Sequence, residues 1–394
     1  MRGILYFILL VSLVSRAQTD YKFIDKHSDD VSCLAFSPDN THIVSGGWDS
    51  KLIVYSNDSL YVIQQELKDF HGAVKSIAFS RDGYKMLAGG QEGKLAIYGF
   101  NDLSSWDIVG LDSFLNINNS QINKLIYGPG MRTIFIAGDD GNFITYDLTK
   151  KKILKVVTKR PISAACVSID RRSYFIANEG SATITQYDVF GKVLRTYEGH
   201  LDNVTDILVT PNRKYLISSS KDRTIKIWNL QNGKVENTII QHTWAVTDIE
   251  LDPFGVYLVS CGLDGGVGLF SVETGDKLMF EVLPKHKCNA IAISPDLTKI
   301  AVAASMDGSE SSGFYIIPTK LKARNIKLPK RYFADKKEKE LYESIYEEHK
   351  EDKVEKTEVK PKPVKTPSSK EKKESKSSSE VILKKSKQVE IRMD

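Results

Sequence analysis

Histidines recur along residues 21–317 at a spacing of about 43 residues, and this repeat limits the possible folds more than any other feature. The intervals between successive members are 44, 129, 42 and 44 residues, and 129 is three times 43; the members are His27, His71, His200, His242 and His286. Seven units of this length therefore fit into the segment. A period of about 40–45 residues with several short strands per unit is typical of a β-propeller, in which each unit forms one blade.

The units share one pattern of alternating apolar residues punctuated by turn residues. The first unit contains VSCLAFSPDN, HIVSGGWDS, KLIVYSND and LYVIQQEL, and the fifth contains VTDILVTPNR, YLISSSKD and RTIKIWNL. The third and fourth units lack the opening histidine but keep the layout and end in Tyr146-Asp147 and Tyr187-Asp188. We therefore predict an all-β fold, a seven-bladed β-propeller over residues 18–319.

The ends of this segment predict how the ring closes. The segment YKFID, Tyr21–Asp25, precedes the first repeat, and the seventh unit ends near Pro318 with three strands. Pairing the N-terminal segment with the last unit would remove both exposed strand edges. We expect the N-terminal strand to complete the seventh blade.

These residues resemble the WD-repeat β-propeller family, most clearly in the fifth unit, GHLDNVTDILVTPNRKYLISSSKDRTIKIWNL, residues 199–230. The resemblance implies a structural tetrad in which an aspartate accepts an imidazole N–H and a serine bridges the imidazole and an indole N–H. In the fifth unit its members are His200, Ser218, Asp222 and Trp228. Partial sets follow in the first unit, His27, Ser45, Asp49 and Tyr55, and in the sixth, His242, Ser260, Asp264 and Phe270.

A His–Ser–Asp set also occurs in hydrolases, so a catalytic role has to be weighed. Here the set recurs in register in three units, which is what a requirement of the fold produces, whereas a nucleophile site would be single. Asp206 and Asp248 recur in register too, within VTDI, and we attribute them to repeat geometry. The histidines have no metal-ligand spacing and no glycine-rich phosphate loop is present. We therefore predict no catalytic residues, no metal and no cofactor.

A binding surface is the expected functional feature. The resemblance implies that residues flanking the first apolar position of the innermost strand face the channel mouth; the matching residues are Lys75, Asn123, Thr205, Thr247, Lys287 and Asn289. Trp244, in the loop HTWAV, either anchors a partner or packs against a neighbouring blade. We predict a monomeric, non-catalytic scaffold for a protein or peptide. The alternative is a propeller enzyme or small-molecule binder that uses the central channel.

The N-terminus has the three-part pattern of a secretory signal peptide over residues 1–17. Arg2 precedes an apolar run from Gly3 to Val14, and Ser15 and Ala17 stand three and one residues before a cleavage point. The run is too short to span a bilayer as a helix, which needs about 20 residues. We expect a secreted, periplasmic or cell-envelope protein with no transmembrane span after cleavage; a buried strand or an uncleaved anchor are the alternatives.

Export would place four cysteines in an oxidising environment. Cys33, Cys166, Cys261 and Cys288 show no C-x-x-C spacing, and we predict four free structural thiols. Aligning AACVSIDRRS with VSCLAFSPDN puts Cys33 and Cys166 at the same position of distant blades, so those two cannot pair.

The positive charge lies almost entirely in the C-terminal tail. Residues 318–394 carry 23 Lys or Arg and 15 Asp or Glu, a net charge of +8, whereas the whole chain has +5. The near-neutral body excludes a basic domain that binds specific nucleic acid. We expect residues 320–394 to be a Lys/Glu/Ser-rich tail, partly helical at first and then disordered. The tail could bind an anionic surface, and an envelope-attached structural protein tethered by it is a further alternative.

Overall fold

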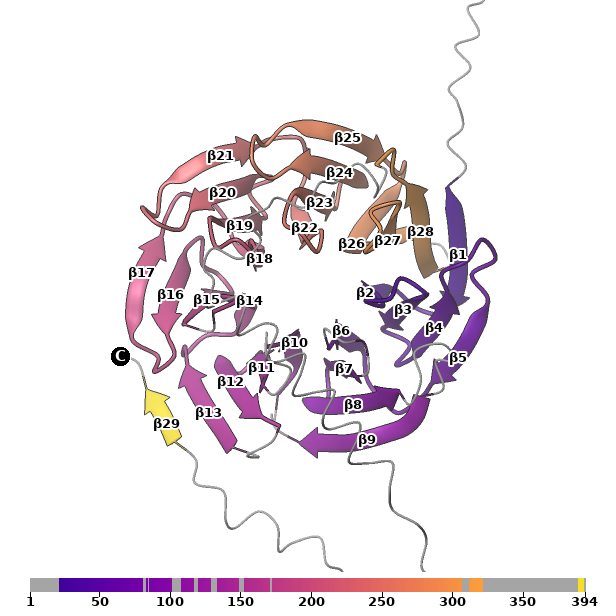
Figure 1. The fold of residues 1–394 in the computed structure, drawn as a ribbon, viewed down its shortest axis with the longest axis horizontal. Coiled ribbons are helices and arrows are strands. Elements are labelled where there is room, and N and C mark those ends of the chain that lie inside the picture. Colours follow the sequence, from indigo (N-terminus) through magenta and orange to yellow (C-terminus); the bar gives the residue numbers. More distant parts are fainter. Residues whose placement is uncertain are drawn as a thin grey trace, which may run out of the picture.

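The computed structural model describes residues 21–80, 83, 85–100, 108–116, 120–128, 133–148, 152–170, 172–306, 312–321 and 389–392. The expected signal peptide and most of the expected tail lie outside these residues. The described residues form an all-β ring of seven four-stranded blades around a central axis (Figure 1). The prediction of a seven-bladed propeller is therefore confirmed.

Within a blade, the strands are antiparallel and follow one another from the channel outward (Figure 1). Blades 1 to 4 consist of β2 (Val31–Phe36), β3 (His42–Gly47), β4 (Leu52–Ser56) and β5 (Ile63–Leu67); β6 (Val74–Phe79), β7 (Lys85–Gly90), β8 (Lys94–Phe100) and β9 (Ile108–Asn116); β10 (Ile122–Tyr127), β11 (Thr133–Gly138), β12 (Asn142–Asp147) and β13 (Lys152–Val157); and β14 (Ile162–Val167), β15 (Ser173–Asn178), β16 (Ile184–Asp188) and β17 (Val193–Tyr197). Blades 5 to 7 consist of β18 (Val204–Val209), β19 (Tyr215–Ser220), β20 (Ile225–Asn229) and β21 (Val235–Ile239); β22 (Val246–Leu251), β23 (Tyr257–Gly262), β24 (Gly266–Ser271) and β25 (Lys277–Val282); and β26 (His286–Ile293), β27 (Lys299–Met306), β28 (Ser312–Pro318) and β1 (Lys22–His27).

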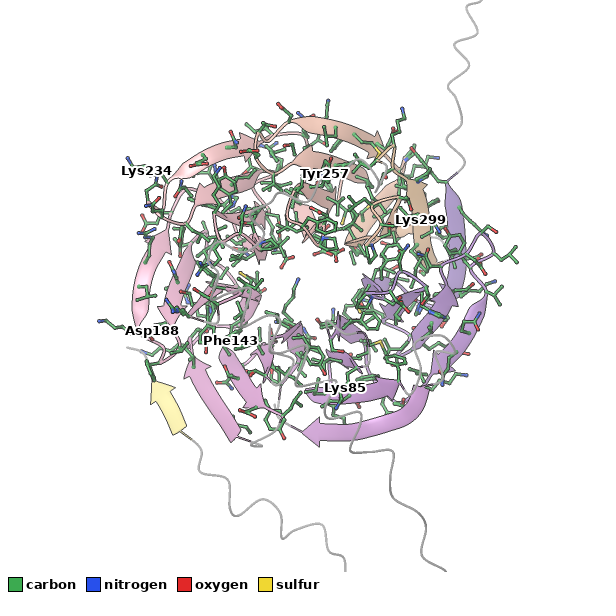
Figure 2. All side chains as sticks on the ribbon, in the orientation of Figure 1. Lys85, Phe143, Asp188, Lys234, Tyr257 and Lys299 are labelled. Atoms are coloured by element: carbon green, nitrogen blue, oxygen red, sulfur yellow. The ribbon has the colours of Figure 1, made fainter. Side chains whose placement is uncertain are left out.

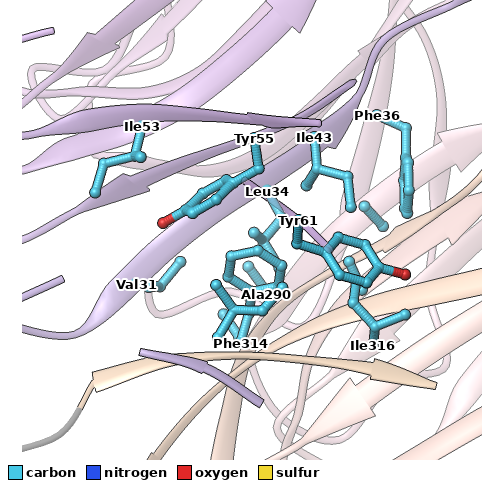
Figure 3. Close-up of a cluster of buried hydrophobic side chains, with 14 residues drawn as sticks. Val31, Leu34, Phe36, Ile43, Ile53, Tyr55, Tyr61, Ala290, Phe314 and Ile316 are labelled. Atoms are coloured by element: carbon cyan, nitrogen blue, oxygen red, sulfur yellow. The ribbon is translucent and has the colours of Figure 1, made fainter. Parts of the chain in front are cut away.

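The hydrophobic core lies between neighbouring blades. The middle strands are buried on both faces, as β3 and β4 show, whereas the outermost strand β5 is largely exposed. Between blades 7 and 1, Tyr55 packs edge-on against Phe314 with ring centroids 5.3 Å apart, and Ile24 and Ile43 are buried beside them (Figure 3). Burying such apolar surface is the main stabilising term, so each blade depends on its neighbours.

The N-terminal strand closes the ring, as predicted. β1 pairs antiparallel with β28, with Lys22 opposite Ile316 and Ile24 opposite Phe314. This strand runs to His27, two residues beyond the expected segment. The sheet of blade 7 therefore contains strands from both ends of the propeller segment, and β1 covers the outer edge of β28.

Every innermost strand carries a β-bulge near its start. In blade 1 the register shifts between Val31 and Cys33, and in blade 5 between Val204 and Asp206; the same shift occurs in the other five blades. In six blades the extra residue is the second of the strand, and in blade 7, whose strand β26 begins at His286, it is the fourth, Asn289. A bulge leaves this residue out of the ladder and re-aims its side chain.

Two details differ from the sequence-based expectations. The pairing of Ala164 with Ala177 and of Cys166 with Phe175 puts Cys166 two residues further along its strand than Cys33, which pairs with Gly46. The two cysteines are therefore not at equivalent positions, and the expected alignment of blade 4 was shifted. In addition, β29 (Val389–Arg392), inside the segment expected to be disordered, pairs in parallel with β13.

We predict that ring closure is needed for stability. Deleting Tyr21–Asp25 should lower Tm sharply, and Ile24→Asn should lower the free energy of unfolding by about 2–4 kcal/mol, because Ile24 is only 5% exposed. Urea unfolding and thermal melts measure both. The control is Asp25→Asn, which changes an exposed residue of the same strand. An unchanged melting curve for the deletion would contradict this model of closure.

Candidate functional site

The His–Ser–Asp–Trp set of blade 5 forms a connected hydrogen-bond chain. His200 Nδ1 lies 2.8 Å from Asp222 Oδ2, and His200 Nε2 lies 2.8 Å from Ser218 Oγ. Trp228 Nε1 donates to the same Ser218 oxygen, also at 2.8 Å. With the proton on Nδ1, the imidazole donates to the carboxylate and accepts from the serine, so each polar atom is satisfied.

Blades 1 and 6 repeat this arrangement with one substitution each. His27 Nδ1 lies 2.9 Å from Asp49, and His242 Nδ1 lies 3.0 Å from Asp264; the second ring nitrogens contact Ser45 and Ser260. The tryptophan position holds Tyr55, whose buried hydroxyl makes no hydrogen bond, and Phe270, which has no polar group. The hydrogen bond from the aromatic residue to the serine, which Trp228 makes in blade 5, is thus not made by Tyr55 or Phe270.

The environment of these sets is that of a buried structural network. The His27 and His200 side chains are 0% exposed, so a substrate has no access to them. Burial alone would raise the pKa of Asp222, but hydrogen bonds from His200, Thr224 and the Leu201 amide outweigh it and hold this pKa well below its usual range. The same balance lowers the pKa of Asp264. The carboxylates stay charged and keep their acceptor role.

A cavity of about 590 Å³ follows the central axis and is lined by the seven innermost strands. Figure 2 shows side chains from these strands reaching into the centre of the ring. Most of the residues expected to bind a partner line this cavity, namely Lys75, Asn123, Thr205, Thr247 and Asn289. These five are all the bulged residues of their strands. Lys287 and Trp244 do not line it.

The bulged side chains bond one blade to the next. Thr205 Oγ1 donates to the carbonyl of Val246 at 2.8 Å, and Thr247 Oγ1 donates to the carbonyl of Cys288 at 2.7 Å. In each case the acceptor is the residue just before the bulge in the next blade's innermost strand. The same link is made by Ser32 to Val74, Asn123 to Ile162 and Ser163 to Val204. Sequence reasoning placed three of these donors in the channel but missed this structural role.

A cluster of charged residues occupies one side of the channel. Lys124 Nζ donates to Asp206 Oδ1 at 2.9 Å, from blade 3 to blade 5. Blade 4 lies between them, and Ala164 occupies its corresponding position. Nearby, Asp248 accepts from the Ile291 amide at 2.9 Å, and Glu250 accepts from the Ile293 amide at 2.8 Å. The first strand of blade 6 thereby also binds blade 7.

Asp248 and Glu250 have raised pKa values. Burial raises the pKa of Glu250 to about 8, and the nearby Asp248 adds to this, while the Ile293 amide and Lys124 oppose it. Burial also raises the pKa of Asp248, to about 7, against the opposing charge of Lys124. Burial disfavours the charged form of Lys124, but its carboxylate neighbours, Asp206 first, outweigh it and raise its pKa. Asp206 and Asp248 are equivalent in register, as expected, yet they have different partners.

The channel opens onto a face that bears two exposed tryptophans. The loop before each innermost strand and the turn after the second strand lie at the same end of a blade, because neighbouring strands are antiparallel. The Trp48 amide bonds to the Asp30 carbonyl across this end, at 2.9 Å. Trp48 is 47% exposed and Trp244 is 59% exposed, so Trp244 is not buried against a neighbouring blade. We call this end, with these loops and turns, the mouth face.

The mouth face also contains a polar hollow of about 330 Å³ near blades 3 to 5, lined by residues that include Gln121, Asp139, Glu179, Asn203 and Lys221. Lys75, on β6 of blade 2, has its ammonium 3.6 Å from the centre of the Trp48 ring. Burial lowers the pKa of Lys75. The mouth therefore combines aromatic and charged groups rather than charges of one sign.

Comparison with known families gives a direct match for three blades. The model described as WD domain, G-beta repeat matches residues 19–56, 191–229 and 233–271. These three segments are similar to WD40 repeats. The three matches fall mainly on blades 1, 5 and 6, which are the blades with a His–Ser–Asp set. The tetrad residues thus lie within the segments that match the repeat model, while the other blades share the fold.

Several proteins resemble parts of this chain. Mitochondrial division protein 1 of Eremothecium gossypii is 25% identical over 134 residues, 31% of this chain and 18% of that protein. Target of rapamycin complex subunit wat1 of Schizosaccharomyces pombe is 33% identical over 78 residues, 19% of this chain and 24% of that protein. WD repeat-containing protein 18 of Danio rerio is 23% identical over 212 residues, 53% of this chain and 43% of that protein. The chain spans less than half the length of each relative.

The fold itself matches a solved propeller. The WD40 β-propeller domain of Doa1 superposes with a TM-score of 0.64 and 21% identity, over 78% of this chain and 99% of that chain. Within the part of the chain that the structure describes, no three His, Cys, Asp or Glu residues are grouped to hold a metal. Among the same residues there is no helix whose length and apolar character would let it cross a membrane.

We predict that the His–Ser–Asp–Trp tetrad of blade 5 stabilises the fold. Asp222→Ala should lower the free energy of unfolding by about 1–3 kcal/mol, because it leaves the buried His200 nitrogen without an acceptor. Asp222→Asn, which keeps an acceptor oxygen, should cost less. Denaturant unfolding measures both, with Asp276→Ala as the control at an exposed turn. Equal stability of wild type and Asp222→Ala would rule out this role.

A second prediction concerns the pH dependence of stability. The folded pKa of Glu250 is about 8, against an ordinary value of 4.5, so between these values the folded state holds a proton that the unfolded state loses. The contribution of protonated Glu250 to the free energy of unfolding is therefore fully present below about pH 4.5 and is lost as the pH rises through 8. Glu250→Gln should match wild type at pH 4 and be more stable by about 1–3 kcal/mol at pH 9.

Urea unfolding at several pH values measures this difference. Glutamine keeps an oxygen that can accept from the Ile293 amide, so the variant isolates the ionisation. Glu198→Gln, at an exposed position before His200, serves as the control and should not alter the pH profile. If Glu250→Gln and wild type keep the same stability difference across the range, Glu250 does not titrate as described.

Proposed function

We propose that this protein is a non-catalytic scaffold that binds a protein or peptide at its mouth face, outside the cytoplasm. WD40 propeller domains are typical of protein-interaction scaffolds. The observation that carries the proposal is the pair of exposed tryptophans, Trp48 and Trp244, on the face where the channel opens. Exposed aromatic residues on a rigid framework supply large contact areas at low entropic cost, and tryptophan is enriched among residues that dominate binding energy.

The rigidity of this surface supports the same role. Trp48 sits in a turn bonded to the preceding loop through Asp30, and the Lys75 ammonium lies over its ring. Trp244 follows His242, which Ser260 and Asp264 hold in place. Both anchors are therefore positioned before a partner arrives, which reduces the entropic cost of binding.

The proposed location rests on the N-terminal sequence. Residues 1–17 have the pattern of a cleavable signal peptide, so we place the protein in the medium, the periplasm or the cell envelope, as a monomer. The tail from residue 320 carries the positive excess and would add an electrostatic contact with an anionic surface. Partner specificity would then belong to the propeller and surface attachment to the tail.

Substitution at the mouth face tests the proposal. We expect partner capture from the native envelope or medium to weaken about tenfold or more in Trp48→Ala and Trp244→Ala. Phe190→Ala is the matched control, because Phe190 is 72% exposed but lies in a turn at the opposite end of its blade. Truncation after residue 319 should remove salt-sensitive attachment and leave mouth binding intact. Unchanged capture by both tryptophan variants would refute the proposal.

The channel favours one second candidate, the binding of a small cationic molecule. A cavity of about 590 Å³ whose wall carries three carboxylates, two of them not paired with a lysine, is large enough for such a ligand, although Lys75 and Lys124 also line it. The variants above separate the two functions. A channel ligand would bind Glu250→Gln more weakly and be insensitive to Trp244→Ala, whereas a mouth partner would show the reverse.

A further inference from the structure

Two buried cysteines lie next to each other across the boundary between blades 6 and 7. Cys261 is on β23, the second strand of blade 6, and Cys288 is on β26, the innermost strand of blade 7. Both are 0% exposed and both are free thiols. One side chain touches both residues. Thr247 Oγ1 lies 3.3 Å from Cys261 Sγ and donates to the Cys288 carbonyl at 2.7 Å.

The repeat allows their separation to be judged from other blades. Cys261 pairs with Asp248 as Gly46 pairs with Cys33, and Cys288 pairs with Ala304 as Val74 pairs with Gly90. Cys261 and Cys288 therefore stand where Gly46 and Val74 stand at the boundary of blades 1 and 2.

At that equivalent boundary, a Cβ added to Gly46 would lie 3.1 Å from the Cβ of Val74. Disulfides need Cβ atoms about 3.5–4.5 Å apart. The two positions are thus as close as a disulfide requires, and a small outward adjustment brings them into its range. Cys33 lies beside Gly46 and Cys166 lies in blade 4, so neither has a cysteine at the equivalent position of the adjacent blade.

We propose that Cys261 and Cys288 form an interblade disulfide when the protein folds under oxidising conditions. With a low-molecular-weight disulfide such as oxidised glutathione as oxidant, one cysteine thiolate attacks a glutathione sulfur and releases the first reduced glutathione. The second cysteine thiolate then attacks the mixed disulfide and releases another. The two cysteines lose two protons and two electrons, and one oxidised glutathione becomes two reduced molecules.

The bond must form before the ring is complete. Both thiols are fully enclosed in the folded protein, and burial raises the pKa of Cys288 to about 12, so the attacking thiolate is scarce there. While blade 7 is still docking against blade 6, the thiols are accessible. The disulfide would then tie the last blade to its neighbour, beside the sheet that β1 completes, and would resist reduction in the closed ring.

The test is to refold the reduced full-length chain in a mixture of oxidised and reduced glutathione. The product is then denatured without reductant, treated with iodoacetamide, digested and analysed by mass spectrometry. We expect two of the four thiols to escape labelling and a cross-linked peptide pair to join Cys261 to Cys288. Protein that is reduced in denaturant and refolded without oxidant should have a lower Tm than the cross-linked product. For a chain that fails to refold, the same labelling applies to protein exported to a bacterial periplasm.

The repeat itself supplies well-matched variants. Cys261→Gly introduces the residue found at Gly46, and Cys288→Ala removes the second sulfur without adding volume beside Cys261, so each should fold, give no cross-link and have the same Tm whether refolded with or without oxidant. Cys166→Ala should keep the cross-link. Labelling of all four thiols in the refolded wild type, or a cross-link that involves Cys33 or Cys166, would overturn the proposal.

Discussion

The pairing of β1 with β28 is the constraint on which the rest of the structure depends. A blade buries its apolar residues only against the blades on either side, so an open ring would expose a face of blade 1 and a face of blade 7. The closing strand adds Ile24 to the cluster around Tyr55 and Phe314, which includes residues from both blades. Closure therefore completes the core as well as a hydrogen-bond ladder, and it fixes the diameter of the channel.

The sequence predicts this architecture well because the information is local. The period near 43 residues, the alternation within each strand and the His–Ser–Asp spacing can all be counted along one unit. Hence the blades, the closing strand and the residues around His200 follow from sequence. The Lys124–Asp206 pair does not. Its members are 82 residues apart, on blades separated by a third, and their meeting depends on the curvature of the ring and on the small side chain of Ala164.

The bulge explains why residues were located correctly while part of their role was missed. Thr205 and Thr247 line the channel, as the family resemblance implies, but the bulge turns their hydroxyls toward the neighbouring blade's carbonyl. A pattern of Ser, Thr or Asn at the second strand position was visible in sequence and is the signal for this link. For Trp244, by contrast, the sequence left burial and exposure open, because loop packing is set by neighbouring blades rather than by the loop's own residues.

The position that follows the bulge in the innermost strands shows where the propeller can vary without losing its fold. It holds Ser76, Lys124, Asp206, Asp248 and Ala290 in different blades. These side chains line the cavity, so packing between blades does not require one type at this position. The bulged position, in contrast, is a hydrogen-bond donor to the next blade in five of the seven. Structural demands and chemical variation thus alternate along a single strand, and this alternation lets one side of the channel become charged while the ring stays closed.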